Sequence, residues 1–225
     1  MTELILASNN RKKIAELETF FASASSKEIR VRTLSDIGWT GEIEEDGDSF
    51  EENSLIKAMV PASLGKIGTA DDSGLAVDAL NGAPGVYSAR YSGEGADDAK
   101  NRAKLLRELC SVPEEKRGAK FVCVMTLVLP EQSGIVVPEE WRADAALCEK
   151  RGIDPARVMN VRGECNGRIL TQERGSGGFG YDCLFWYPEF GATFGETPQE
   201  KKNGVSHRGR AMKEFTRRLL AMLGE

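Results

Sequence analysis

Two adjacent carboxylates, Asp71 and Asp72, are the residues best suited to chemistry in this sequence. They stand at the end of a predicted strand, before a turn at Ser73 and Gly74. Carboxylates suit Mg²⁺, which prefers oxygen ligands and usually takes only one or two from a protein. Because side chains alternate along a strand, the two cannot both face one point. We assign metal binding or activation of water to Asp72 and a structural role to Asp71. The alternative is a pair that caps the turn.

A second candidate site contains Ser8, Asn10 and Lys13, where a short apolar strand is predicted to lead into a helix. The free backbone N–H groups at a helix start attract anions, and Lys13 adds a full positive charge. The pattern indicates a phosphate site, although an ordinary cap with a surface lysine has the same sequence. Arg90, with lysines elsewhere, also favours a polyphosphate ligand. The glycine-rich lysine motif of P-loop NTPases does not occur in the sequence.

An acidic run from Glu42 to Asp48 precedes the next predicted helix. Such runs are usually solvated loops, but this one could offer a carboxylate to the same metal as Asp72. We assign that role to Glu44, and Glu45 stays open as the alternative.

The helix after the acidic run has a clear predicted start. Ser49 and Glu52 form the pattern of a capping box. Asn53 and Lys57, four residues apart, share one face and are predicted to reach toward the same site. Pro61 is predicted to end or kink the helix near residue 60.

Two segments of the C-terminal half also contain candidate site residues. A glycine-rich loop, Gly175–Asp182, contains Phe179, an aromatic side chain suited to stacking on a base if it is exposed and to core packing if it is not. His207 and Arg208 stand at the start of the last predicted helix, where their donors suit a carbonyl or phosphate oxygen. The alternative for His207 is a surface side chain with no function.

Composition excludes several classes of function. The net charge of −5 argues against sequence-independent binding to nucleic acid or to an anionic membrane. The single histidine excludes mechanisms that need two. No apolar run approaches the length of a membrane span, and the N-terminus lacks the pattern of a signal peptide. The five cysteines contain no C-x-x-C pair, which is typical of reduced thiols in a cytoplasmic protein.

The order of the predicted elements indicates a mixed α/β fold. The opening strand, helix and strand predict a parallel βαβ unit, and the apolar run at 121–129 predicts a central strand buried on both faces. Residues 131–160 are predicted to form a polar excursion between strands, with a short helix near 143–150. Strands are predicted at 4–7, 29–34, 66–70, 75–80, 121–129, 158–162, 168–171 and 184–187, and helices at 14–21, 50–60, 97–110 and from 206 onward.

Taken together, six motifs closely resemble the inosine triphosphate pyrophosphatase family, the noncanonical purine nucleoside triphosphate pyrophosphatases. They run in the family's order from residue 4 to the last helix. The matching motifs are Ser8-x-Asn10-x-x-Lys13, Phe50-x-x-Asn53-x-x-x-Lys57-Ala58, 70–78, 82–93, Gly178-Phe-Gly-Tyr-Asp182, and Lys202 followed by Ser206-His-Arg-Gly209.

The resemblance implies a fold and an activity. The fold would be a mixed elongated sheet flanked by helices, with two lobes and a central cleft, in one domain over 1–225 with an insertion at 131–160. The activity would be hydrolysis of ITP, dITP and XTP to the monophosphate and pyrophosphate with Mg²⁺, which cleanses the nucleotide pool. The family also implies a cytoplasmic homodimer.

The resemblance assigns a role to individual residues. Glu44 and Asp72 would be the metal ligands, with Asp72 also the candidate base for the attacking water. Lys13, Lys57 and Lys202 would hold phosphates, Phe179 would stack on the base, and Asp182 would help to read its edge. The full implied substrate-binding set is Ser8, Asn9, Asn10, Arg11, Lys12, Lys13, Lys57, Ser73, Phe179, Gly180, Tyr181, Asp182, Lys202, His207 and Arg208.

An N–H of Arg208 or His207 opposite position 6 of the base would donate to the 6-oxo group of hypoxanthine or xanthine. It would find no acceptor in the 6-amino group of adenine, which would therefore be rejected. The sequence departs from the family at Cys183, where proline is usual, and at Pro61. Two alternatives stay open: a Maf-type nucleotide pyrophosphatase with another base preference, and a non-catalytic nucleotide-binding protein.

Overall fold

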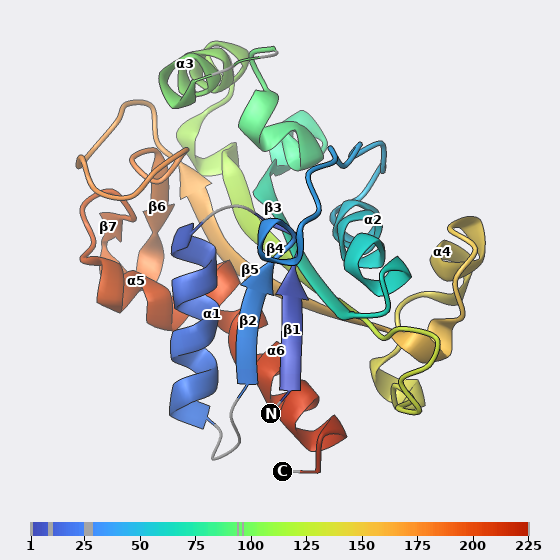
Figure 1. The fold of residues 1–225 in the computed structure, drawn as a ribbon. Coiled ribbons are helices and arrows are strands. Elements are labelled where there is room, and N and C mark those ends of the chain that lie inside the picture. Colours follow the sequence, from blue (N-terminus) through green and yellow to red (C-terminus); the bar gives the residue numbers. More distant parts are fainter. Residues whose placement is uncertain (1, 9–10, 25–28, 94, 96, 225) are drawn as a thin grey trace. The chain divides into compact units, whose positions relative to one another are not determined.

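The computed structural model describes residues 2–8, 11–24, 29–93, 95 and 97–224. Its elements confirm the predicted mixed α/β fold (Figure 1). The strands are β1 (Thr2–Leu6), β2 (Ile29–Thr33), β3 (Ile67–Val77), β4 (Gly118–Val128), β5 (Val158–Ile169), β6 (Phe185–Tyr187) and β7 (Ala192–Thr193). The α-helices are α1 (Arg11–Ala24), α2 (Phe50–Ser63), α3 (Asp98–Glu108), α4 (Ala145–Lys150), α5 (Gln199–Val205) and α6 (His207–Met222).

The strands form one seven-stranded sheet in the order β2-β1-β3-β4-β5-β6-β7. β1 pairs in parallel with β2 and with β3, so that Leu4 lies opposite Val31 on one side and Ile67 on the other. β6 pairs antiparallel with both β5 and β7. The parallel βαβ opening and the mixed sheet were therefore predicted correctly.

The described chain divides into two compact units. The first unit comprises residues 1–72, 124–162 and 211–225, and the second comprises 73–123 and 163–210. Three strands, β3, β4 and β5, contribute residues to both units. Each unit has its own cluster of buried apolar side chains.

In the first unit, α1 runs beside β2, as Figure 1 shows. Its Leu17 and Phe21 are buried, which is the periodicity of an amphipathic helix. α2 contributes Leu55 and Ala58 to a core that also contains Ile5 of β1. α1 therefore packs near β2, and α2 packs near β1.

The N-terminus of α2 confirms Ser49 as the predicted cap, whereas the Glu52 side chain binds the backbone of the preceding residue, Asp48, and not that of the cap. The Ser49 Oγ accepts a hydrogen bond of 3.1 Å from the Glu52 backbone N–H, and Glu52 accepts in turn from the backbone N–H of Asp48. Pro61 was predicted to end or kink the helix near residue 60, and the first alternative was wrong, because α2 continues to Ser63. Pro61 lies in the last turn, where its missing N–H removes only one hydrogen bond, the one that the Lys57 carbonyl would accept.

The predicted turn at residues 71–74 was also wrong. β3 is continuous from Ile67 to Val77, so the two carboxylates lie in the middle of a strand and not at its end. Asp, Ser and Gly favour turns locally, but β3 lies between β1 and β4, and sheet pairing prevails over that preference. The same override joins the two short strands predicted at 158–162 and 168–171 into β5.

The second unit has an aromatic core. Phe121 of β4 packs against Phe185 at 4.5 Å between ring centroids, and Phe194 stacks near both. α3 begins after Asp97, whose carboxylate accepts from the Lys100 N–H, which confirms the helix predicted at 97–110. β4 is buried along nearly its whole length, as predicted.

The polar segment 131–160 contributes to the first unit. It contains α4, which confirms the short helix predicted near 143–150, and it includes the first residues of β5. That this segment is an insertion stays a prediction. The last helix, α6, confirms the helix predicted from residue 206 onward, and it buries Met212, Phe215 and Leu219. In the described ranges, no helix has the length and apolar character needed to cross a membrane.

Candidate active site

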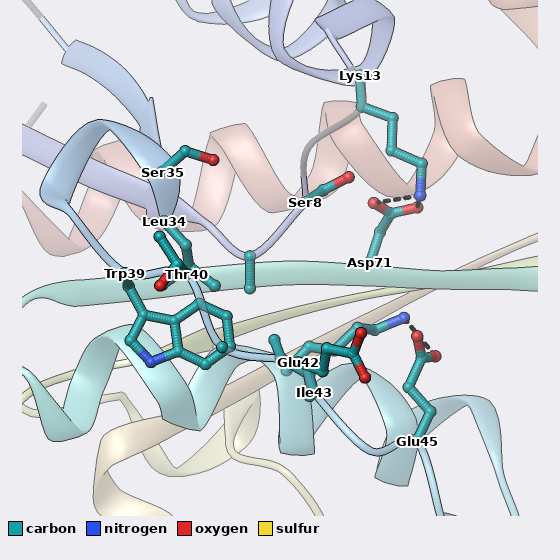
Figure 2. Close-up of a pocket in the computed structure, with 13 residues that line it drawn as sticks. Ser8, Lys13, Leu34, Ser35, Trp39, Thr40, Glu42, Ile43, Glu45 and Asp71 are labelled. Atoms are coloured by element: carbon teal, nitrogen blue, oxygen red, sulfur yellow. Dashed lines mark hydrogen bonds and ion pairs between the residues drawn. The ribbon is translucent and has the colours of Figure 1, made fainter.

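A pocket of about 700 Å³ in the first unit brings together residues that directly follow β1 and β2 with residues of α1, α2, β3 and the loop before α2 (Figure 2). One part of its wall is charged, and another contains Leu34, Trp39 and Ile43. The lining residues are Ala7, Ser8, Lys13, Leu34, Ser35, Trp39, Thr40, Gly41, Glu42, Ile43, Glu45, Lys57 and Asp71.

Lys13 and Asp71 form the first ion pair of the pocket. The Lys13 Nζ lies 2.8 and 3.0 Å from the two carboxylate oxygens of Asp71, so one ammonium contacts both oxygens. Figure 2 shows Lys13 extending from α1 toward the carboxylate on β3. Asp71 is buried. The pair therefore holds a positive charge at the pocket wall, next to Ser8.

Lys57 of α2 contacts two carboxylates from distant parts of the chain. Its Nζ lies 2.9 Å from Oε2 of Glu45 and 3.2 Å from Oδ1 of Asp72. Asp71 and Asp72 thus pair with different lysines, as the alternation of side chains along a strand requires. Burial lowers the pKa of Lys57, but the negative charges of Asp72 and Glu45 outweigh it and raise that pKa above its ordinary value.

Asp72 combines a buried, unpaired carboxylate oxygen with a raised pKa. Its Oδ2 is buried and has no hydrogen-bond partner in the described part of the chain. Burial raises the pKa of Asp72, and the opposing charge of Lys57 does not fully cancel that effect. A buried carboxylate oxygen without a partner is costly unless something binds it. Its donor type fits a hard divalent cation.

The structure brings Glu45, and not Glu44, to Lys57 and Asp72. Glu45 is half-buried and lines the pocket, whereas Glu44 is exposed. No group of three or more His, Cys, Asp or Glu side chains gathers as a metal site among the described residues, and the carboxylates next to Lys57 are Glu45 and Asp72. One or two protein carboxylates are usual for Mg²⁺. Metal binding by Glu44 stays a prediction.

The N-terminal phosphate site is described in part. Ser8 and Lys13 both line the pocket. Asn9 and Asn10 lie outside the described residues, as do the side chains of Arg11 and Lys12, and the predictions for these four residues stay predictions.

The predicted base-reading residues belong to the second unit. Phe179 is 67% exposed, which agrees with an aromatic side chain open to a ligand. The loop behind it is tightly built. Asp182 is buried, and its Oδ2 accepts hydrogen bonds from the Phe179 N–H at 2.9 Å and from the Lys202 Nζ at 2.6 Å. Gly178 has a φ of +74°, and a Cβ there would lie 2.1 Å from that same oxygen.

Asp182 and Lys202 therefore hold the loop in shape. The Lys202 Nζ also lies 5.0 Å from the ring centroid of Phe179, within the range of a cation–π contact. Tyr181 is buried and donates from its hydroxyl to the Ser88 carbonyl at 2.8 Å, while the Gly180 N–H donates to Asp98. Substrate contacts by these residues stay predictions.

Three further predicted residues are half-buried in the second unit. Ser73 follows the two carboxylates on β3. His207 and Arg208 begin α6, and the His207 ring stacks on Phe121 with 4.8 Å between centroids. Ser206 caps this helix by accepting from the Gly209 N–H, as predicted.

Sequence reasoning missed two residues of the pocket. Asp71 lies in its wall, although it was assigned only a structural role, and Trp39 covers another part. A Cβ on Gly41 would lie 2.6 Å from the Trp39 ring, so the indole packs directly on that backbone. The Trp-Thr-Gly sequence was the only local signal for this contact.

Glu52, beside the pocket, gives the first unit a dependence on pH. Burial raises its pKa, but hydrogen bonds from Lys150, the Asp48 N–H and Arg151 outweigh burial and lower it from 4.5 to about 2. Because the pKa of Glu52 is lower in the folded state than in the unfolded state, Glu52 stabilises the fold at pH values above its unfolded pKa of about 4.5. This stabilisation is lost as the pH falls from about 4.5 toward 2.

We therefore expect Glu52→Gln to lower the free energy of unfolding by about 2–3 kcal/mol at pH 7. The difference from the wild type should shrink below pH 4.5, because protonation then neutralises Glu52 in the unfolded wild type. Urea unfolding at a series of pH values measures both. Glu51→Gln, which affects an exposed pair with Arg162, is the control, with an effect below about 1 kcal/mol. A difference that stays constant with pH would contradict the assignment.

The sequence model of the Ham1 family matches residues 4–218. The chain belongs to the Ham1 family. It is 46% identical to the dITP/XTP pyrophosphatase of Geobacter sulfurreducens over 213 residues, which cover 94% of each chain. It is 42% identical to the dITP/XTP pyrophosphatase of Listeria monocytogenes over 224 residues, covering 99% of this chain and 97% of the relative.

A solved structure extends the likeness to the fold. The HAM1 protein from Coxiella burnetii superposes with a TM-score of 0.82 at 34% identity and covers 98% of this chain and 100% of that one. The Ham1 family membership agrees with the resemblance drawn from the six motifs.

Proposed function

We propose that this chain hydrolyses the noncanonical purine nucleoside triphosphates ITP, dITP and XTP to the monophosphate and pyrophosphate. One observation carries the proposal. The pocket is lined by Lys13 and Lys57 together with Asp71 and Glu45, which pair with them, in a chain of the Ham1 family. Relatives with more than 40% identity along nearly the whole chain are named dITP/XTP pyrophosphatases, which supports the substrate class.

Lys13 and Lys57 would bind the triphosphate. Each ammonium is held in place by carboxylates in the structure. Phosphate oxygens can share these ammonium donors, and the hydroxyl of Ser8 would add a neutral donor. Because phosphoryl transfer depends on positioning and on neutralising negative charge, fixed lysines supply much of what the reaction needs.

The donor set fits Mg²⁺, with the unpartnered Oδ2 of Asp72 as the central observation. Asp72 would hold the cation together with a carboxylate of the acidic loop, Glu45 by its position or Glu44 by the motif. The bound cation would neutralise charge on the phosphate chain.

Asp72 is also the candidate base for the attacking water. Burial raises its pKa, which makes the carboxylate a better proton acceptor than an exposed aspartate. Water deprotonated toward Asp72 would attack the α-phosphorus, with pyrophosphate as the leaving group. Lys57, which contacts Asp72 Oδ1, would orient that carboxylate.

Base selection would fall to the second unit. The exposed ring of Phe179 suits stacking on a purine, and Lys202 beneath it fixes the loop. N–H groups of His207 and Arg208 would donate to a 6-oxo group, and opposite the 6-amino group of adenine such a donor would stay unpaired. We also propose a homodimer in the cytoplasm. The family resemblance supports this, and all five cysteines are thiols in the structure.

A panel of nucleotides with Mg²⁺ tests the function. We expect ITP, dITP and XTP to yield monophosphate and pyrophosphate, with kcat/KM for ATP lower by about 10²-fold or more, because a mismatch of buried polar groups is strongly rejected. Chromatography of the nucleotide products, with and without added inorganic pyrophosphatase, measures the cleavage position. Release of orthophosphate alone would contradict the proposal, preference for pyrimidine nucleotides would favour the Maf-type alternative, and binding without turnover would favour a sensor.

A further inference from the structure

The acidic loop before α2 is irregular in conformation but firmly anchored. Its Gly47 N–H donates to Oδ1 of Asn53 at 2.9 Å, and its Asp48 N–H donates to Oε2 of Glu52 at 3.0 Å. Both acceptors stand on the first turn of α2, and their residues are only 1% and 3% exposed. Buried hydrogen bonds of this kind fix the backbone of the loop.

The fit at Gly47 is too close for any other residue without a shift. A Cβ there would lie 2.7 Å from Oδ1 of Asn53 and 2.8 Å from Cγ of Glu52. Asn53 was predicted to reach toward the substrate with Lys57. In the structure its amide oxygen binds the loop, whose Glu45 contacts Lys57.

Arg151, which follows α4 in the segment 131–160, completes the anchor. Its Nη2 lies 2.9 Å from Oδ1 of Asp46, and its Nε donates to Oε1 of Glu52 at 2.7 Å. One planar guanidinium thus joins a side chain of the loop to the first turn of α2. A lysine cannot reproduce this two-pronged geometry.

These contacts lie next to Glu45, the residue of the acidic loop that lines the pocket and pairs with Lys57. Asp46 is the neighbour of Glu45, whose Oε2 is 2.9 Å from the Lys57 Nζ. A carboxylate on an untethered loop would lose conformational entropy when it engages a cation, whereas an anchored one has lost it already. Partners that orient a metal ligand typically change metal affinity or activity by about 10–100-fold when removed.

We infer that Arg151, with Asn53 and Glu52, positions the acidic loop so that its carboxylate is set for a divalent cation beside Asp72. This inference rests on the proposed function. It gives the polar segment 131–160 a task in the reaction, although none of its residues lines the pocket. Arg151 acts through Glu45 and is a positioning residue, not a catalytic one.

The test compares Arg151→Ala with Arg162→Ala. Arg162 pairs with Glu51 at 2.6 Å on the same turn of α2 and so matches Arg151 in charge and in attachment to the helix. Hydrogen exchange of the Gly47 and Asp48 amides reports the anchor. We expect exchange to accelerate about tenfold in Arg151→Ala, because this variant loses charge-assisted hydrogen bonds. Exchange should change little in Arg162→Ala.

The link to the cation has two readouts. Binding of Mn²⁺ alone to the nucleotide-free protein, followed by electron paramagnetic resonance, should weaken about tenfold in Arg151→Ala. The Mg²⁺ concentration that gives half-maximal pyrophosphate release should rise by a similar factor, with a smaller change in kcat at saturating Mg²⁺. Arg151→Lys should fall between the wild type and Arg151→Ala, because it restores the charge but not the fork.

Asp46→Asn keeps the test decisive if Arg151→Ala fails to fold. Asp46 is exposed, and this variant leaves the Arg151 contact to Glu52 in place. It should accelerate exchange at Gly47 by about two- to fivefold, as loss of an exposed ion pair implies. Unchanged exchange and unchanged Mn²⁺ affinity in these variants would overturn the inference. A wild type that releases no pyrophosphate would refute the proposed function instead, and the exchange and Mn²⁺ comparisons would still judge the anchor.

Discussion

Asp72→Asn is expected to lower kcat for pyrophosphate release from ITP by about 10²–10³-fold, or on the order of 3–4 kcal/mol of barrier. Asparagine has the shape of aspartate but neither the charge that holds a cation nor the basicity to accept a proton from water. The unpartnered Oδ2 of Asp72 is the atom whose loss matters most. Because Lys57 retains Glu45 as a partner, the fold should survive the change. Steady-state kinetics at saturating Mg²⁺, with circular dichroism to verify folding, measure the effect.

Asp78→Asn is the matched control. Asp78 follows directly after the end of β3 and is exposed. Asp78→Asn therefore removes a negative charge at the surface and leaves the charges of the pocket unchanged. We expect kcat within about twofold of the wild type, as for surface substitutions in general. A near wild-type rate for Asp72→Asn would remove Asp72 from the mechanism.

Lys57→Met should impair both catalysis and stability. The buried ammonium neutralises Glu45 and Asp72, and removing it leaves two carboxylates facing each other's charge. Breaking a buried pair costs about 3–5 kcal/mol, and partial exposure of Glu45 reduces this to about 2–3 kcal/mol. Loss of a positive charge that contacts the phosphates should also lower kcat/KM by about 10²–10³-fold.

Mg²⁺ separates these two effects. In Lys57→Met a cation can take the place of the ammonium between the carboxylates, so Mg²⁺ should raise the melting temperature of the variant more than that of the wild type. Lys66→Met, at an exposed lysine 3.6 Å from Glu3, is the control and should alter neither quantity. If Mg²⁺ did not stabilise Lys57→Met, Glu45 and Asp72 would not form a cation site. A kcat/KM within threefold of the wild type would exclude Lys57 from triphosphate binding.

Local patterns predicted much of the fold. The Ser49 cap depends on residues three positions apart, and the βαβ opening depends on the order of short apolar and amphipathic runs. Both were confirmed. The error at 71–74 has the opposite origin. Turn-forming residues occupy a central strand because β1 and β4 pair on either side of it, and no short window of sequence contains that information.

The candidate site was predicted by residue type better than by exact position. The structure brings Lys57 to Asp72 and to Glu45, the open alternative to Glu44, and their roles stay predictions. That one-residue difference depends on how Asn53 holds Gly47. Arg151 lies 99 residues from Glu52 in the sequence, and nothing in its polar surroundings indicated the contact.

The first unit is assembled from three separate stretches, the last of which begins at residue 211. On the ribosome, the strands and the carboxylates of the pocket would emerge well before α6, which supplies the buried Phe215 and Leu219. Native packing of this unit must therefore wait until α6 has emerged. Until then the nascent chain exposes apolar surface that chaperones recognise.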